Sequence, residues 1–148
     1  MTNKNIELLY KDLSARTSYG VKVKCNDGYI FTFDKMHMGI GMLYTDYYRQ
    51  PLETPDIILS GCFYGNDIKP YLFPLSSMTE EQYDNFILVS GWDGDYEDIK
   101  RGKFSCVGYI GLDYIYDTID WFNKNHFDYR GLISLGLAID ATGLGIYE

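Results

Sequence analysis

The chain has 148 residues, about the length of one domain, and 46% of them are hydrophobic. This composition excludes intrinsic disorder, and a chain of this length can bury a core without a disulfide or a structural metal. The 21 acidic and 13 basic residues give a formal charge of -8, so we expect neither nucleic acid nor a membrane surface as a partner. The length predicts a single domain over residues 1–148. Because the number of cysteines is odd and no run is apolar enough to span a membrane, we expect this domain in a reducing cytoplasm.

The first elements are a helix and a β-hairpin. Apolar residues at helical spacing predict an amphipathic helix over about residues 5–16 (Ile6, Leu9, Tyr10 and Leu13). Residues 21–25 alternate apolar with basic, residues 26–28 read Asn-Asp-Gly, and residues 29–33 are rich in strand formers. Asn-Asp-Gly is a strong turn signal, so we predict a hairpin whose lysines face away from the core.

The middle of the chain predicts short strands and then a helix. Glycine and proline punctuate residues 36–75, and we expect strands near 40–44, 57–64 and 68–73. Pro70 and Pro74 cannot donate to a ladder, so we predict that the last of these strands lies at a sheet edge or is merely extended.

The sequence around Thr79 predicts the start of a helix over about residues 80–90. Thr79 and Gln82 have the spacing of a capping box, in which each side chain bonds the backbone of the other. Met78 and Tyr83 are spaced as a hydrophobic staple, and Gly91 is expected to end the helix.

The last third predicts an acidic loop over 92–98, a short strand over 104–109 and a helix over 112–124. Apolar residues repeat at helical spacing in that helix (Leu112, Ile115, Tyr116, Ile119 and Phe122). We expect Asn125 to adopt a left-handed conformation and Asp128 to cap a final short helix (with Leu132, Ile133 and Leu137). The predicted fold is one compact α+β domain with an antiparallel sheet, on which the N-terminal helix and the C-terminal helices pack.

Two segments, residues 67–81 and 120–138, carry a resemblance. The first reads Lys-Pro-Tyr-Leu-Phe-Pro-Leu-Ser-Ser-Met-Thr-Glu-Glu from Lys69, and the second contains His-Phe-Asp-Tyr-Arg-Gly-Leu-Ile from His126. Both are similar to segments of small uncharacterised proteins carried by phages and prophages of gut anaerobes. The resemblance implies a mobile-element origin and assigns no activity to any residue.

Metal and cofactor chemistry have little support in the sequence. The only histidines are His37 and His126, and no cysteine pair has ligand spacing. Residues 93–104 imitate a calcium loop, but Asp98 stands where the loop needs glycine. No glycine motif for nucleotides is present, and the thiols lie in strand-like apolar runs typical of buried inert cysteines (Cys25, Cys62 and Cys106). We predict no metal, no cofactor and no catalytic set.

His126, Asp128 and Arg130 form the densest polar cluster in the sequence. Together they could supply a proton donor, a proton acceptor and a guanidinium fork for a phosphate or carboxylate. The structural alternative is that His126 and Asp128 cap helices and that Arg130 pairs with an acid. Both interpretations stay open at this point.

The 15 tyrosines are the most unusual feature of the composition. Tyrosine combines a stacking face with a hydroxyl, which suits protein interfaces and ring-binding pockets. Residues 44–49 would present several aromatic rings beside a guanidinium, with Tyr48 and Arg49 adjacent. The alternative is that a strand-rich core consumes the aromatics.

From these features we expect a phage or prophage binding protein rather than an enzyme, acting in the host cytoplasm as an anti-defence or host-takeover factor. Its partner would be a host protein or a small nucleotide-like ligand, held by the candidate residues (His126, Tyr129, Arg130, Tyr48 and Arg49). Two alternatives remain: a structural or accessory phage protein that self-associates as a homo-oligomer, and a small enzyme that uses His126, Asp128 and Arg130.

Overall fold

The computed structural model describes residues 3–25, 28–33, 37–39, 42–48, 58–63, 68–92, 94–103 and 112–148. Its helices are α1 (Asn3–Arg16), α2 (Glu80–Ser90), α3 (Tyr96–Lys100) and α4 (Leu112–Lys124). Its strands are β1 (Lys22–Cys25), β2 (Ile30–Thr32), β3 (His37–Gly39), β4 (Met42–Tyr48), β5 (Ile58–Phe63), β6 (Ile68–Leu72) and β7 (Ile139–Asp140). These elements confirm the predicted α+β class.

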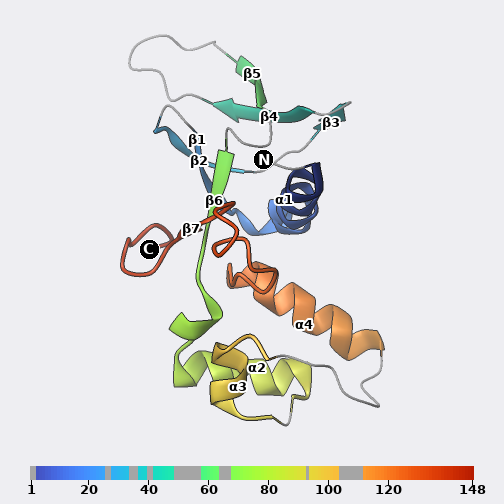
Figure 1. Cartoon of the computed structure of the whole chain (residues 1–148), viewed down its shortest axis with the longest axis vertical. Coiled ribbons are helices and arrows are strands. Elements are labelled where there is room, and N and C mark those ends of the chain that lie inside the picture. Colours follow the sequence, from blue (N-terminus) through green and yellow to red (C-terminus); the bar gives the residue numbers. More distant parts are fainter. Residues whose placement is uncertain are drawn as a thin grey trace.

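The strands form two sheets. The first has the order β2-β1-β6-β7, and the second has the order β3-β4-β5. Strands β1 and β2 form the predicted hairpin, and β5 and β6 lie where strands were expected near 57–64 and 68–73. Strand β4 overlaps the strand expected near 40–44 but continues to Tyr48, and β3 was not predicted. In Figure 1 the second sheet lies at one end of the molecule and α2 and α3 lie at the other, with β6 running between them.

The prediction of an antiparallel sheet is only partly correct, because the first sheet is mixed. Strand β1 is antiparallel to β2 and β6, whereas β7 is parallel to β6. The sequence did not predict β7, which has only two residues and pairs with a strand far away along the chain.

The prediction that Pro70 marks an edge strand is wrong, since β6 has a neighbour on each side. Pro70 is opposite Val23 of β1. Strand β7 pairs only with Tyr71 and Leu72, after the proline, so the missing N–H group of Pro70 is not needed on that side.

The start of α2 follows the prediction. The Gln82 backbone N–H donates to Thr79 Oγ1 at 3.2 Å, and the Thr79 N–H donates to Gln82 Oε1 at 2.9 Å, completing the capping box. Gly91 ends the helix with a φ of 61°, a left-handed conformation that glycine adopts without steric cost. Met78 is buried and Tyr83 packs on the same core, as expected for a staple.

The helical content of the next segment differs from the prediction. The expected acidic loop contains α3, whose Ile99 is fully buried and whose Tyr96 hydroxyl donates to the Met78 carbonyl oxygen. Helix α4 has the predicted bounds, but Tyr116 and Ile119 are exposed and the buried face carries Trp121. The strand expected over 104–109 lies outside the described residues.

The expected C-terminal helix is absent, and residues 129–136 form a series of turns. Gly131 and Gly136 have φ angles of 73° and 71°, which a right-handed helix does not accommodate. The left-handed residue after α4 is His126, with a φ of 58°, rather than Asn125. Asn125 continues the helical pattern, because its N–H donates to the Trp121 carbonyl oxygen at 3.0 Å.

The described part of the chain has two hydrophobic cores. The first lies between α1, the hairpin, β6 and the C-terminal segment (Leu9, Leu13, Val21, Val23, Phe33, Leu72, Leu132 and Leu137). The second joins α2, α3 and α4 (Met78, Phe86, Ile99, Trp121, Phe122 and Phe127). The cores adjoin where the C-terminal end of α1 approaches the end of α4, and polar side chains occupy this junction.

Candidate functional site

A buried ion pair lies at the junction of the two cores. Arg16 Nε donates to Asp12 Oδ2 at 2.7 Å, and Arg16 Nη2 donates to Asp12 Oδ1 at 3.0 Å. Both side chains are completely buried. This two-pronged geometry satisfies the carboxylate and uses the planar shape of the guanidinium, which lysine cannot reproduce.

The same guanidinium connects α1 to the second core. Arg16 Nη2 also donates to the Phe127 carbonyl oxygen at 2.8 Å, and Arg16 Nη1 donates to the Phe122 carbonyl oxygen at 3.4 Å. These carbonyl groups lie at and just after the end of α4, and each also accepts a backbone N–H, that of Phe122 from Phe127 and that of Phe127 from Tyr129. Arg16 therefore bonds acceptors on both sides of the junction.

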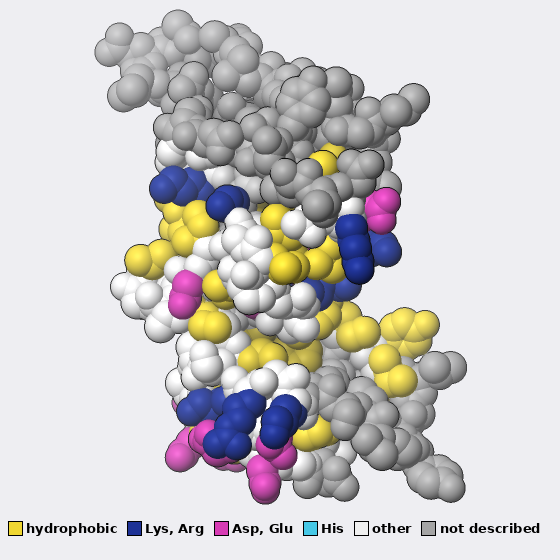
Figure 2. Space-filling model, viewed as in Figure 1, with side chains coloured by type: hydrophobic (Ala, Val, Ile, Leu, Met, Phe, Trp, Pro, Cys, Tyr) yellow, Lys and Arg dark blue, Asp and Glu magenta, His cyan; other side chains and the backbone are white. Residues whose placement is uncertain are grey.

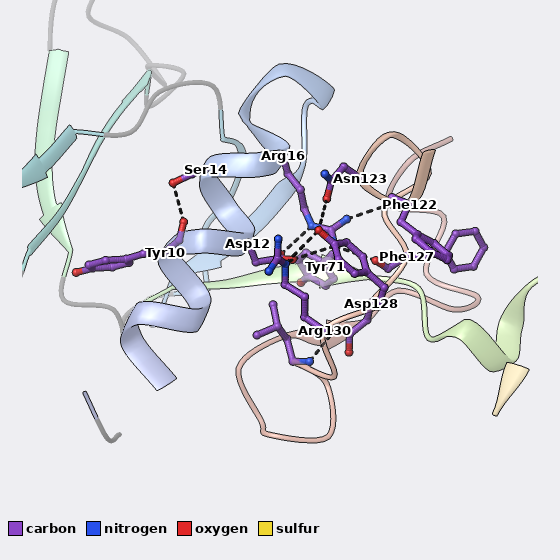
Figure 3. A network of polar contacts seen from close by, with 12 residues as sticks. Tyr10, Asp12, Ser14, Arg16, Tyr71, Phe122, Asn123, Phe127, Asp128 and Arg130 are labelled. Carbon is purple, nitrogen blue, oxygen red and sulfur yellow. Dashed lines mark hydrogen bonds and ion pairs between the residues drawn. The ribbon is translucent and has the colours of Figure 1, made fainter. Parts of the chain in front are cut away.

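A second guanidinium, that of Arg130, approaches the same carboxylate (Figure 3). Arg130 Nε lies 3.3 Å from Asp12 Oδ1 and donates to the Tyr129 hydroxyl at 3.1 Å. Neither Nη1 nor Nη2 of Arg130 makes a hydrogen bond with any residue that the structure describes. With its side chain 26% exposed, Arg130 keeps two donor groups available at the surface.

Tyr129 holds this arrangement in place. Its ring stacks on Phe122 with centroids 5.3 Å apart, and its hydroxyl donates to Asn123 Oδ1 at 3.2 Å. The guanidinium carbons of Arg130 and Arg16 lie 4.8 and 5.5 Å from the Tyr129 ring centroid, within the range of cation–π attraction. Two guanidinium groups therefore share the buried carboxylate of Asp12.

Two hollows open beside Arg130. The α4 hollow has a volume of about 400 Å³ and lies between α4 and the C-terminal segment (Leu75, Thr118, Ile119, Phe122, Asp128 and Tyr129). The α1 hollow has a volume of about 580 Å³ and lies against α1 (Glu7, Tyr10, Lys11, Ser14 and Ala15). In the face shown in Figure 2, the middle of the molecule is largely hydrophobic or uncharged, whereas acidic and basic side chains mix at the end formed by α2 and α3.

Asp128 is buried and accepts two backbone hydrogen bonds. The Leu132 N–H donates to Oδ1 and the Ile133 N–H donates to Oδ2, both at 2.8 Å. Asp128 therefore does bind backbone N–H groups, as the structural alternative required, but in a turn rather than at a helix. The final short helix that Asp128 was expected to cap is absent, so no helix N-terminus lies beside Arg130.

His126 lies in a different environment from Arg130. Its ring stacks on Tyr147 with centroids 3.9 Å apart, and its buried Nδ1 atom has no hydrogen-bond partner among the described residues. Burial, assisted by the nearby Arg16 charge, lowers the pKa of His126 from 6.5 to about 4. No hydrogen bond or ion pair within the described ranges joins any two of His126, Asp128 and Arg130, so they do not form an assembled acid–base set.

Tyr147 links the C-terminal segment to the sheet. The Lys22 N–H donates to its hydroxyl at 3.2 Å, and that hydroxyl donates to the Tyr71 carbonyl oxygen at 2.6 Å. The hydroxyl thus bridges β1 and β6 just beyond their last paired residues. Burial raises the pKa of Tyr147 to about 12, so the hydroxyl keeps its proton for this bridge.

The structure brings together only part of the predicted site. Tyr129 and Arg130 are in contact, whereas His126 contacts Tyr147. Of the other two candidates, the structure describes the backbone of Tyr48 but not its side chain, and Arg49 lies outside the described residues.

Sequence reasoning missed Asp12 and Arg16, although a signal existed. The two charges are four residues apart and follow Leu9 and Leu13 by three residues each, which puts them on the apolar face of α1. A charged pair on a buried helix face requires partners and identifies a polar centre.

No protein-family model, curated protein or solved structure matches this chain. No helix among the described residues is long and apolar enough to cross a membrane. The same residues contain no cluster of three or more histidine, cysteine, aspartate or glutamate side chains arranged for a metal ion.

Proposed function

We propose that the protein is a non-enzymatic binding protein of a phage or prophage, which acts in the host cytoplasm and contacts its partner through Arg130. The observation that carries this proposal is the pair of Arg130 Nη groups, which make no hydrogen bond with the described residues and border two hollows. Such a fork suits a carboxylate or a phosphate group. The partner is a host protein or a small nucleotide-like molecule, as expected for an anti-defence or host-takeover factor.

Preorganisation supports this role for Arg130. Its Nε is already held by Asp12 and Tyr129, so binding would cost less side-chain entropy than at a mobile surface arginine.

A capture experiment from host lysate tests the proposal, with bound proteins and extracted small molecules identified by mass spectrometry. Arg130→Ala is expected to lose the captured partner. Arg101→Ala is the matched control, because Arg101 is exposed and contacts only Glu97 among the described charged groups. Equal capture by both variants, with circular dichroism showing an intact fold, would refute a role for Arg130.

The self-association alternative has one specific observation in its favour. Large apolar side chains are exposed on α2 and α4 (Leu88, Tyr114, Tyr116 and Ile119). Exposed apolar groups that cluster are typical of protein–protein contacts. Light scattering after size-exclusion chromatography tests this alternative, which requires a mass above the 17.1 kDa of one chain.

A further inference from the structure

A third hollow, the α2 hollow, opens between α2 and the end of α4. Its volume is about 550 Å³, and Arg130 is not part of its lining. Side chains of α2 line one wall and two residues at the end of α4 line the other (Glu81, Asp84, Asn85, Leu88, Trp121 and Asn125). In Figure 1, α2 lies at the end of the molecule opposite the second sheet. This hollow is therefore a surface separate from the proposed Arg130 contact.

The hollow offers an apolar contact that water now covers. Leu88 is 82% exposed, more than any other large apolar side chain that the structure describes. Trp121 is 6% exposed, and its ring is held by Phe127 and Phe86, with centroids 5.5 and 5.2 Å away. A partner side chain placed between Leu88 and this fixed indole would remove apolar surface from water. A groove between two helices is a common docking place for the apolar face of an amphipathic helix.

The charge of the hollow selects a cationic partner. Glu81 and Asp84 are exposed, and neither forms an ion pair with a described residue. They precede Leu88 by seven and four residues, so all three lie on one face of α2. The described lining contains no lysine or arginine, and Lys124, the one basic residue of α4, does not belong to it.

Two side-chain amides in the lining suit a peptide. Asn85 Oδ1 accepts the Trp121 Nε1–H at 2.7 Å, which leaves Nδ2 without a partner among the described residues. Asn125 Nδ2 donates to the Trp121 carbonyl oxygen at 2.8 Å, which leaves Oδ1 in the same condition. One amide donor and one amide acceptor thus complement the C=O and N–H groups of a peptide.

We infer that the α2 hollow binds a basic amphipathic segment of a partner protein. An apolar side chain of that segment covers Leu88 against Trp121, and its lysine or arginine side chains pair with Glu81 and Asp84. A second copy of this chain is the less suitable occupant, because each copy carries a formal charge of -8 and the two would repel. The inference goes beyond the proposed function and does not depend on Arg130.

Three peptides of one length, about 15 residues or four helical turns, test the partner class by heteronuclear NMR titration of the full chain. All three carry the same leucines at helical spacing, and the remaining polar positions are lysine, glutamine or glutamate. We expect the lysine peptide to bind with a dissociation constant on the order of 100 μM and the glutamine peptide about 10-fold more weakly. The glutamate peptide is expected to give no saturable shifts.

Three outcomes of this titration would overturn the inference. Equal binding of the lysine and glutamine peptides would remove any role for Glu81 and Asp84. Tightest binding of the glutamate peptide would assign the contact to a basic surface such as that of Arg130. Absence of saturable shifts with the lysine peptide would exclude this class of partner.

Matched variants at exposed positions locate the peptide. Leu88→Lys is expected to weaken binding of the lysine peptide by more than about 10-fold, because it removes the apolar contact and adds a like charge. Leu135→Lys is the control, since Leu135 is 50% exposed and does not line the hollow. Asp84→Asn is expected to weaken binding by about 3-fold, whereas Glu7→Gln, which removes an exposed carboxylate of α1, is expected to leave it unchanged.

The variants also separate this inference from its alternatives. Equal losses in Asp84→Asn and Glu7→Gln would show that binding follows the net charge and not the hollow. Unchanged binding by Leu88→Lys would likewise overturn the inference. If light scattering shows a dimer of the unmodified chain that Leu88→Lys dissociates, the occupant is a second copy and the inference is wrong. Arg130→Ala is expected to bind the lysine peptide normally whether or not it captures a partner from lysate, and a loss of peptide binding in this variant would move the site to the junction.

Discussion

Replacing Arg16 by lysine keeps the buried positive charge but removes the geometry of the guanidinium. Arg16 makes two hydrogen bonds with Asp12, at 2.7 and 3.0 Å, and one of 2.8 Å with the Phe127 carbonyl oxygen. A single ammonium nitrogen cannot occupy the positions of Nε and Nη2 together, so about two charge-assisted hydrogen bonds are lost. At about 1.5–3 kcal/mol each, with partial replacement by the ammonium, we expect a loss of about 3 kcal/mol of unfolding free energy.

Urea unfolding followed by tryptophan fluorescence and circular dichroism measures this loss. The matched control is Arg101→Lys, since Arg101 is 62% exposed and lies 3.7 Å from Glu97. An exposed pair of this kind is expected to change stability by less than about 0.5 kcal/mol. If Arg16→Lys shifts the free energy of unfolding no more than Arg101→Lys does, the buried guanidinium does not hold the junction together.

Three further predictions follow from single side chains. Because the pKa of His126 is about 4 in the folded protein and 6.5 ordinarily, the unfolded chain binds more protons between these values. The stability that neutral His126 contributes is therefore complete above pH 6.5 and is lost as the pH falls through 4, by about 3 kcal/mol in total. Urea unfolding of the native chain and of His126→Asn at a series of pH values measures this loss. If the stability of the two chains changes in parallel with pH, the prediction is wrong. Thr79→Ala removes one hydrogen bond of the capping box and should lower stability by about 0.5–2 kcal/mol, so an unchanged denaturation midpoint would argue against the cap. The thiol of Cys25 is buried and should react slowly with a thiol reagent, which peptide mass mapping after brief native-state labelling would check; rapid modification would show that the hairpin opens.

Local signals explain which parts of the fold were predictable. The capping box, the staple and Gly91 lie within one short segment, so the sequence alone determines the bounds of α2. Asn-Asp-Gly likewise predicts the β1–β2 hairpin from adjacent residues. Pro70 was misjudged because its strand has a neighbour, β7, that comes from the far end of the chain.

The candidate site shows the same division between local and distant information. Asp128 was correctly predicted to accept backbone N–H groups, but the left-handed Gly131 prevents the helix that was expected to supply them. The alternative that Arg130 pairs with an acid is confirmed, but the acid is Asp12 in the first helix. No pattern within the C-terminal segment could identify that partner, because only tertiary packing brings the two together.

The partners of Arg16 also affect the order of events during synthesis. Its acceptors at Phe122 and Phe127 are separated from it by 106 and 111 residues. At the usual elongation rates, about 5 to 20 s pass before these carbonyl groups leave the ribosome's catalytic centre. During that interval the guanidinium and its carboxylate can pair with each other in a nascent helix, yet the surface that will enclose them has not been made. The N-terminal helix must therefore stay hydrated on this face until Phe127 has emerged, so the junction closes late relative to the synthesis of α1.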